Sequence, residues 1–335
     1  MERQQQIQQW LADLWPGRHF ELLPASADAS FRRYFRAVFA DNGGSHIVMD
    51  APPENEDCRP FIHVATLLRE AGLNAPDVLA EDLRRGFLLL SDLGRQTYLD
   101  VINEDNADAL IRPAIAALVS WQMASRSGVL PPYDEALLRR ELALFPDWYC
   151  ARHVGFDLAG EKGKWSGLLA DIENKLVASA LAQPQVYVHR DWMPRNLMVS
   201  EPNPGILDFQ DAVFGPIGYD VMSMFRDAFL SWDEEREIDW IVRYWEQAKR
   251  AGLPVDSDFA EFYRAAEWIG LQRHLKVLGI FARLNYRDGK PAYLADTPRF
   301  IAYARRVANR YRQLQPLLLL LDALENRVVQ IGYTF

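Results

Sequence analysis

The sequence is poor in cysteine and contains no long apolar run. Among its 335 residues are two cysteines, Cys58 and Cys150, which lie far apart and have no Cys-x-x-Cys or Cys/His spacing around them. This pattern argues against a zinc site and against a disulfide framework. Both cysteines are therefore expected to be buried and inert. No apolar run approaches the about 20 residues that cross a bilayer, so no membrane association is expected, and the leucine block at 317–321 predicts a buried helix.

A basic surface is also absent. Lys and Arg number 37 against 46 Asp and Glu, which gives a net charge of −9 and an isoelectric point near 5.3. Proteins that bind nucleic acid usually carry a basic patch, so nucleic acid is not an expected partner. The acidity is compatible with Mg²⁺ and with small molecules, and no obligate protein partner is indicated. The N-terminus lacks the order of charged, apolar and small residues of a secretory signal, which predicts a cytoplasmic protein.

The first part of the chain, residues 1–92, predicts a small lobe of mixed α and β structure. Apolar residues recur at helical spacing over 4–14, before the breaker pair Pro16-Gly17. An Asp-Asn-Gly-Gly turn at 41–44 separates two β-prone runs and predicts a hairpin. The expected elements after the first helix are strands over 31–39 and 46–49, a helix over 61–71, and strands over 78–80 and 87–90.

The remainder, residues 93–335, predicts a larger and mainly helical lobe, so the expected fold class is α+β. Helical periodicity covers 106–125, 134–149, 164–182, 234–251, 258–284 and 298–325. A segment with many polar residues, at 185–212 and called the polar island below, interrupts these helices. It contains three short β-prone runs, at 186–188, 197–199 and 205–207. Catalytic groups favour loops held by a rigid scaffold, so the island is the expected place for chemistry.

The island carries a His-x-Asp-x-x-x-x-Asn pattern that is followed by Asp-Phe. The pattern consists of His189, Asp191 and Asn196, and Asp208 follows Asn196 by 12 positions. Phosphoryl transfer requires a group that orients the attacking hydroxyl and oxygen ligands for a metal that neutralises phosphate charge. We therefore expect Asp191 to align the hydroxyl, and Asn196 and Asp208 to bind Mg²⁺. Taken singly, each residue is more often a helix cap or a satisfied core group, but the joint pattern favours chemistry.

These motifs resemble those of the aminoglycoside phosphotransferase and choline kinase superfamily, over about residues 24–284. The resemblance implies a bilobal, protein-kinase-like fold whose N-terminal lobe binds nucleotide, with ATP and Mg²⁺ as cofactors. The run at 88–94 is similar to the hinge between the lobes of this family. The resemblance implies that main-chain groups of Ser91, Asp92 and Leu93 contact the adenine ring. The specific matches are residues 88–94, 189–196, 207–209 and 218–221.

The resemblance also implies a role for individual residues of the island. Asp191 corresponds to the catalytic base, and Asn196 and Asp208 correspond to the metal ligands. His189 and Asp220 correspond to structural supports of the catalytic loop. Because the transition state of phosphoryl transfer is loose, positioning should contribute more than strong proton abstraction, and a modest carboxylate is adequate.

The chain departs from the kinase pattern because its third strand has no lysine. Residues 47–53 stand in that place, and the first lysine of the chain is Lys162. Arg32 and Arg33 lie where the phosphate-covering hairpin should be, and arginine binds phosphate bidentately. We expect these arginines to contact ATP phosphates, with Ser30 and neighbouring amides covering the nucleotide. The alternative is that each arginine lies on a solvated face of a strand.

The acceptor is indicated by resemblance to one branch of the superfamily. Residues 27–36, 48–53 and 208–212 are similar to the kinases that phosphorylate C1 of N-acetylmuramate and N-acetylglucosamine in peptidoglycan recycling. An anomeric hydroxyl is more acidic than an ordinary alcohol, which suits a mild base. A basic cluster on one predicted helix could meet the lactyl carboxylate, although such a cluster is more often a solvated helix face. The candidate sugar contacts are Trp192, Asp211, Arg273, His274 and Lys276.

Two other functions remain open on the sequence. A phosphotransferase for an aminoglycoside, choline or another cationic alcohol would need a pocket lined by carboxylates or aromatic rings, and the basic cluster near Arg273 speaks against it. A nucleotide-binding regulator without catalysis would fit the absence of the strand lysine. Asp191, Asn196 and Asp208 are all present, however, which favours an active kinase.

Overall fold

The chain folds into two compact units in the computed structural model, which describes residues 2–27, 31–41 and 43–332. The first unit consists of Met1–Trp121 and Pro194–Asp211, and the second of Gln122–Met193 and Ala212–Phe335. An antiparallel sheet lies in the first unit and the second is mainly helical, which confirms the predicted α+β class. The predicted lobes, 1–92 and 93–335, stay a prediction.

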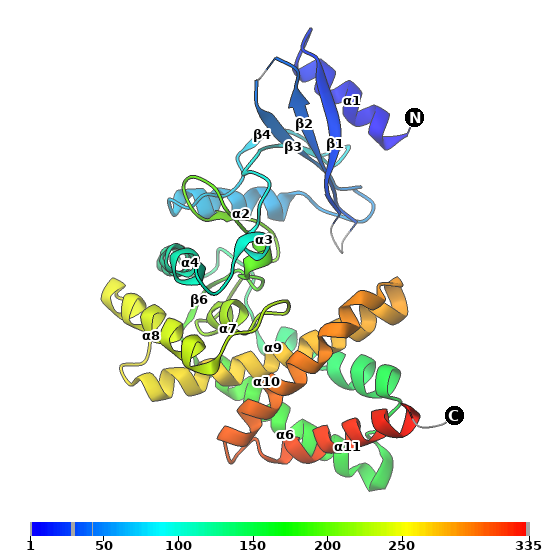
Figure 1. The fold of residues 1–335 in the computed structure, drawn as a ribbon, viewed down its shortest axis with the longest axis vertical. Helices are drawn as coiled ribbons and strands as arrows, with labels where there is room; N and C mark the ends of the chain where they lie inside the picture. The colour runs from blue at the N-terminus through cyan, green and yellow to red at the C-terminus, as the bar shows by residue number, and fades with distance from the viewer. Residues whose placement is uncertain (1, 28–30, 42, 333–335) are drawn as a thin grey trace. The chain divides into compact units, whose positions relative to one another are not determined.

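The sheet of the first unit has the strand order β1-β2-β3-β5-β4, with every neighbouring pair antiparallel (Figure 1). The predicted hairpin is formed by β2 and β3, which pair Phe35 with Val48 and Arg33 with Asp50. The strands are β1 (Phe20–Ala27), β2 (Arg33–Phe39), β3 (Ser45–Asp50), β4 (Val78–Asp82) and β5 (Phe87–Ser91).

Two glycines with a left-handed backbone let the chain turn between elements of the first unit. Helix α2 (Arg59–Glu70) is followed by Gly72 with a φ of +74°, the left-handed conformation that commonly closes a helix. Between β4 and β5, Gly86 has a φ of +72°, and a Cβ there would collide with the carbonyl oxygen of Ala51. A side chain at residue 86 would therefore push the turn away from the end of β3.

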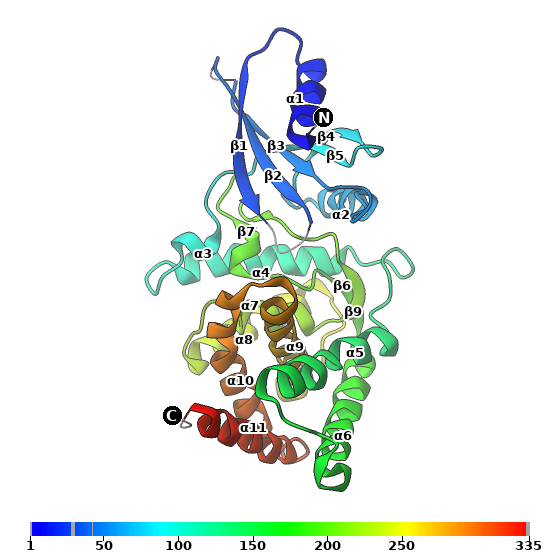
Figure 2. The same ribbon diagram turned by 90° about the vertical axis from the view of Figure 1, so that its right-hand side faces the viewer.

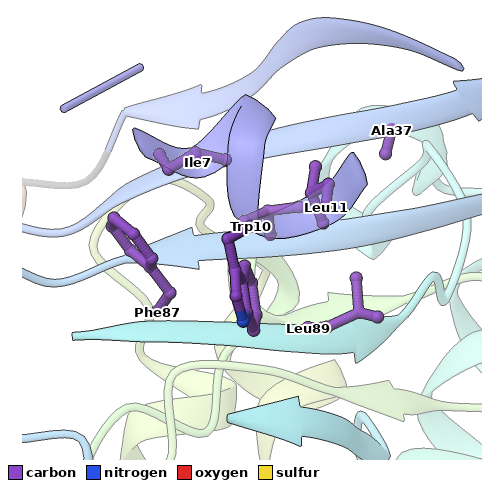
Figure 3. Packing of buried hydrophobic residues seen from close by; sticks show 7 residues of the cluster. Ile7, Trp10, Leu11, Ala37, Phe87 and Leu89 are labelled. Atoms are coloured by element: carbon purple, nitrogen blue, oxygen red, sulfur yellow. The ribbon is translucent and has the colours of Figure 1, made fainter. Parts of the chain in front are cut away.

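Helix α1 (Arg3–Leu14) packs against one face of this sheet, as the close view in Figure 3 shows. Its buried side chains Ile7, Trp10 and Leu11 follow the predicted helical spacing. The indole of Trp10 lies on the ring of Phe87, with 5.7 Å between ring centroids. Phe87 and Leu89 are two positions apart and so face the same side of β5. The strand residues of this cluster are Ala37, Val48, Phe87 and Leu89.

Truncation of Trp10 tests this packing. Its side chain is 6% exposed, so Trp10→Ala should lower the free energy of unfolding by about 3–5 kcal/mol through lost burial and a cavity. Urea unfolding measures the change, and the exposed Gln8→Ala on the same helix should stay within about 0.5 kcal/mol of the wild type. A loss below about 1 kcal/mol for Trp10→Ala would contradict the cluster.

The rest of the first unit brings the two short strands of the polar island against the N-terminal segment. Strands β7 and β8 pair with each other, Leu197 opposite Ile206. Single β-bridges join Asn74 to Gly205 and Thr97 to Met198. The elements are α3 (Tyr98–Val101), α4 (Ala107–Met123), a 3₁₀ turn (Pro194–Asn196), β7 (Leu197–Met198) and β8 (Gly205–Ile206).

The second unit is built around α9 (Phe259–Asp288), which lies among α7, α8 and α10 in Figure 2. Its side chains are buried along much of its length. It packs against α6, α7, α10 and a π-helical segment. Strand β6 (Gln185–Val188) pairs with β9 (Val213–Pro216) and leads into the His-x-Asp pattern. The helical elements are α5 (Glu135–Leu142), the π-helical segment (Phe145–Val154), α6 (Gly160–Ala182), α7 (Tyr219–Phe225), α8 (Glu234–Ala251), α9, α10 (Thr297–Arg310) and α11 (Pro316–Gly332).

Two of the predicted helices were wrong as single elements. The stretch 134–149 divides into α5 and the π-helical segment, because Pro146 cannot donate a helical hydrogen bond. The stretch 298–325 divides into α10 and α11, and Pro316 takes the first position of the second helix, where its missing N–H costs nothing. Periodicity continues across both breaks, which is why the sequence pattern hides them.

The cysteines are buried, as predicted, and burial raises the pKa of the Cys58 thiol to about 11. A thiol protonated at neutral pH is a poor nucleophile, which fits an inert residue. Of the helices in the described part of the chain, none has both the length and the apolarity that a membrane crossing demands.

Candidate active site

A buried carboxylate at the start of α7 holds the backbone after β6. Asp220 accepts hydrogen bonds from the backbone N–H groups of His189 and Arg190, at 2.7 and 2.9 Å. Its side chain is fully buried, and burial raises the pKa of Asp220 to about 7 although both hydrogen bonds oppose the rise. The negative charge of Asp191 adds to this rise, whereas Arg273 opposes it.

The residue before Asp191 has an unusual backbone conformation. Arg190 has a φ of +78°, a left-handed conformation that costs a non-glycine residue about 1–3 kcal/mol. Contacts on several sides hold it: Asp220 takes its N–H, its carbonyl accepts the Ser223 hydroxyl at 3.4 Å, and its guanidinium binds Glu141 at 2.5 Å. Such strain is typical of functional sites, because the surroundings fix one conformation.

The neighbours of Asp191 are also fixed. The N–H of Asp191 donates to Nδ1 of His189 at 3.3 Å, which requires the proton of a neutral ring to lie on Nε2. The imidazole of His189 meets the indole of Trp192 edge to face, with 5.4 Å between centroids. His189 and Trp192 are fully buried, whereas Asp191 is partly accessible. The arrangement leaves Asp191 able to meet a ligand, and its catalytic role stays a prediction.

Glu141 on α5 is a functional candidate that the sequence analysis missed. Its carboxylate binds Arg190 and the ammonium of Lys276, the latter at 3.0 Å, and accepts hydrogen bonds from Tyr133 and Gln272. Burial raises the pKa of Glu141, but the two cations and the two hydrogen bonds together outweigh burial and lower the pKa to about 2. A glutamate amid the buried leucines and phenylalanine of 138–145 was the pattern that could have revealed it.

The first unit brings Asn196 and Asp208 together at the ends of β7 and β8. The Asn196 amide lies 3.4 Å from Oδ2 of Asp208, and the N–H of Leu207 donates to the carbonyl of Asn196 at 2.9 Å. Asp208 has a left-handed φ of +59°, and its Oδ1 accepts a hydrogen bond from Gln210 at 2.8 Å. The backbone strain again marks a candidate functional position.

This pair fits Mg²⁺ chemically. One amide oxygen and one carboxylate are hard ligands, and Mg²⁺ commonly takes few protein ligands and fills its octahedron with water and phosphate oxygens. In the described part of the chain, no group of three or more His, Cys, Asp or Glu side chains could hold a metal. Any Mg²⁺ here would therefore depend on the nucleotide for further ligands. The metal-binding role of Asn196 and Asp208 stays a prediction.

The predicted adenine-binding run continues from β5. Asp92 pairs with Arg36 through two hydrogen bonds of 2.6 and 3.0 Å, and accepts the Ser45 hydroxyl at 2.6 Å. Burial raises the pKa of Asp92, but Arg36 and Ser45 outweigh it and lower the pKa below its usual value. The Ser91 hydroxyl accepts the N–H of Asp77 at 2.8 Å. The side chains of Ser91 and Asp92 thus make hydrogen bonds within the protein. Contacts of Ser91, Asp92 and Leu93 with the nucleotide would therefore come from the main chain.

The predicted phosphate-binding arginines lie beside carboxylates. Asp50, fully buried, pairs with Arg33 from β2 and with Arg3 from α1. About half of the Arg33 side chain is exposed, at 49%, whereas Arg32 is 10% exposed and lies 3.8 Å from Glu56. Asp50 therefore holds the Arg33 guanidinium while about half of the side chain stays accessible to solvent, a combination that suits phosphate binding. Ser30 lies outside the described residues.

The predicted sugar-binding residues differ in their surroundings. Arg273, His274 and Lys276 lie in the interior of the second unit, so the alternative of a solvated helix face was wrong. Lys276 is engaged by Glu141 and by the Tyr219 hydroxyl, at 3.0 Å each. Burial, then Arg226 and Arg273, hold the pKa of His274 well below its usual value.

Asp211 and Trp192 complete this group. Asp211, which belongs to the first unit, is exposed. Trp192, in the second, is fully buried, so its ring packs inside that unit. The sugar-binding roles of all five residues stay predictions.

The raised pKa of Asp220 predicts a pH dependence of stability. Between the ordinary value of 3.8 and about 7, the native state keeps a proton that the unfolded state has lost. The Asp220 contribution to the free energy of unfolding therefore falls as pH rises through this window.

Asp220→Asn removes this titration, so its free energy of unfolding should decrease less than that of the wild type between about pH 5 and about pH 8. Urea unfolding at each pH measures the slope, and the exposed Asp233→Asn serves as the control. Parallel pH profiles for wild type and Asp220→Asn would contradict the raised pKa.

Known proteins with a similar sequence are phosphotransferases, in agreement with the arrangement of these candidate residues. A family model described as a phosphotransferase enzyme family matches residues 21–262. A curated relative from Pseudomonas aeruginosa, named N-acetylmuramate/N-acetylglucosamine kinase, is 57% identical over 305 residues, covering 91% of this chain and 88% of the relative. A relative of the same name from Neisseria meningitidis is 47% identical over 340 residues, with complete coverage of both chains.

A solved structure supports the fold. An ADP-bound aminoglycoside phosphotransferase has a TM-score of 0.56 and 13% identity, and the match covers 88% of this chain and 96% of the other. The predicted kinase-like fold and the predicted family are thus confirmed. By sequence over most of its length and by fold, the chain belongs to the phosphotransferase enzyme family.

Proposed function

We propose that this enzyme transfers the γ-phosphoryl group of ATP to the anomeric C1 hydroxyl of N-acetylmuramate and N-acetylglucosamine, in the cytoplasm, during peptidoglycan recycling. The observation that carries the proposal is the 47–57% identity, over most of the chain, to relatives that bear those sugars in their name. The aminoglycoside phosphotransferase of similar fold is ADP-bound, which supports an adenine nucleotide as the donor.

The candidate residues suit this reaction. Asp191 would accept a hydrogen bond from the C1 hydroxyl of the sugar and so direct the hydroxyl oxygen toward the γ-phosphorus. The fixed backbone of residues 189 and 190 limits the positions that the Asp191 side chain can take. Asn196 and Asp208 would hold Mg²⁺, which neutralises phosphate charge when bound. Because the transition state is loose, the alignment by Asp191 contributes more than its basicity.

The charges near Asp191 support this acceptor over a cationic one. The carboxylate of Asp191 acts electrostatically on Arg190 and on Lys276, and these two cations share the single charge of Glu141. Two cations therefore stand against the two carboxylates of Glu141 and Asp191, so this group of charges has no negative excess that would attract an aminoglycoside or choline, and it tolerates a neutral sugar.

An ADP-release assay tests the proposal. Mg-ATP is supplied with N-acetylmuramate, N-acetylglucosamine, choline or kanamycin in parallel, and turnover is expected with the two amino sugars. Turnover with only choline or kanamycin would replace the proposal with a cationic acceptor. Nucleotide binding without turnover of any of the four would favour a non-catalytic regulator.

Removal of the Asp191 charge tests its role. Asp191→Asn should lower kcat by about 10²- to 10⁴-fold, because the acceptor hydroxyl loses its base and its orienting partner. ATP affinity, measured by calorimetry, should stay within about twofold of the wild type. The control is Asp239→Asn, a carboxylate on the surface of α8 that is 52% exposed. A kcat within about threefold of the wild type would remove Asp191 from catalysis.

The pairing of Asp50 with two arginines provides a matched test of phosphate binding. Arg33→Ala and Arg3→Ala each leave Asp50 with one arginine, so both variants should lose similar stability. If Arg33 contacts ATP phosphates, Arg33→Ala alone should raise the KM for ATP, by about tenfold or more for a lost charge-assisted hydrogen bond. Equal KM values for ATP in the two variants would assign Arg33 a structural role.

A further inference from the structure

The side chain of Arg190 is held by one buried carboxylate, that of Glu141 on α5. The guanidinium of Arg190 lies 2.5 Å from Oε1 of Glu141, and both residues belong to the second unit, as does Asp191. Glu141 is 5% exposed. Arg190 directly precedes Asp191 in the chain and has the left-handed φ of +78°. The contact therefore acts on the residue whose conformation directs Asp191.

Glu141 and Asp220 act on opposite sides of the bond whose rotation is this φ, the N–Cα bond of Arg190. On the nitrogen side, Asp220 accepts the N–H at 2.9 Å; on the Cα side, Glu141 holds the side chain. The Ser223 hydroxyl also lies on the Cα side, but its hydrogen bond to the Arg190 carbonyl is long and weak, at 3.4 Å. A strained φ persists where its surroundings fix it. Glu141 is thus the stronger restraint on the Cα side.

The carboxylate of Glu141 is fully used by protein partners. It pairs with Arg190 and with Lys276, the latter at 3.0 Å, and accepts hydrogen bonds from Gln272 at 3.1 Å and from the Tyr133 hydroxyl. An ionised carboxylate offers about four lone-pair sites, so these four donors leave no place for a substrate hydroxyl or a metal ion. Glu141 therefore acts on the chemistry through its partners.

Burial of an ion pair is not in itself evidence of a functional role, because the second unit contains others. Arg226 at the end of α7 binds Glu237 and Glu267, and these three side chains are fully buried. Those pairs join α7 to α8 and α9. The Glu141 pair differs because its arginine belongs to the candidate catalytic loop, one residue before Asp191.

We propose that Glu141 is a positioning residue for phosphoryl transfer, which holds the Arg190 side chain and thereby the backbone conformation that directs Asp191 at the acceptor hydroxyl. This inference rests on the proposed role of Asp191, and it does not depend on which alcohol accepts the phosphoryl group. A loose transition state relies on alignment. A misplacement of about 1 Å costs about 100-fold in rate.

Removal of either member of the pair tests the proposal. Arg190→Met leaves Glu141 with one cation, Lys276, so the buried charges stay balanced and the variant should fold. Its kcat should fall by about 10- to 100-fold, and Glu141→Gln should cause a similar loss. The KM for ATP should stay within about twofold, because the predicted nucleotide contacts belong to the first unit. A kcat of Arg190→Met within about threefold of the wild type would overturn the proposal.

The double variant distinguishes positioning through Arg190 from an independent effect of Glu141. If Glu141 acts through Arg190, adding Glu141→Gln to Arg190→Met should lower kcat by no more than about twofold further. Two losses that multiply would show independent effects and would overturn the proposal.

Two variants of the same helix serve as controls. Glu135→Gln breaks an exposed ion pair with Arg139 and should leave kcat within about twofold of the wild type. Leu138→Ala removes a fully buried side chain, so it should lower stability while the folded enzyme keeps its kcat. A loss of kcat in Leu138→Ala as large as that in Glu141→Gln would assign Glu141 a purely structural role.

Hydrogen exchange of the loop, measured by mass spectrometry, needs no acceptor. In Arg190→Met, the peptide that contains residues 189–191 should exchange about tenfold faster or more than in the wild type, because the loop opens more readily. Peptides of α10 should keep their rates. Equal exchange of the loop in both proteins would overturn the proposal.

These outcomes separate the inference from the proposed function. If Asp191→Asn keeps the wild-type kcat, the role of Asp191 fails and the inference fails with it. If Asp191→Asn loses activity while Arg190→Met and Glu141→Gln keep theirs, the function stands and the assignment of Glu141 is wrong. If the wild type turns over none of the four acceptors, the proposed acceptor is wrong, and the exchange rates still decide whether Glu141 holds the loop.

Discussion

Two backbone hydrogen bonds into the buried carboxylate of Asp220 hold the loop on which the candidate chemistry depends. They fix the N–H groups of His189 and Arg190, and so hold Arg190 in a left-handed conformation immediately before Asp191. Without this acceptor, two buried N–H groups would lose their partners and the strained residue could relax. Asp191 then would lose the alignment on which phosphoryl transfer relies.

The second unit of this acidic protein places charged side chains in its interior and pairs most of them. Arg226 binds Glu237 at 3.2 Å and Glu267 at 2.7 Å, and all three side chains are fully buried. The carboxylate of Glu141 likewise pairs with two cations, Arg190 and Lys276. Breaking such pairs is costly, so they fix geometry whether or not they add net stability.

Local pattern was enough to predict the elements around the site. Turn chemistry predicted the β2–β3 hairpin, and the β-prone runs of the island predicted the strands that bring Asn196 near Asp208. The burial of the Arg273 cluster and the partners of Glu141 were not predictable in this way. Glu141 meets partners 49 and 135 residues away, and such contacts follow from how helices pack rather than from local spacing. The helix breaks at Pro146 and Pro316 were not predicted, because the apolar residues keep their helical spacing across both breaks.

The central claim is that phosphate is transferred to the anomeric oxygen of an amino sugar. Phosphorus–proton correlation NMR of the product from Mg-ATP and N-acetylglucosamine measures this directly. The account predicts a phosphorus resonance coupled to the anomeric proton H1, together with loss of the reducing end. Coupling to the protons at C6, or a product that keeps its reducing end, would contradict it.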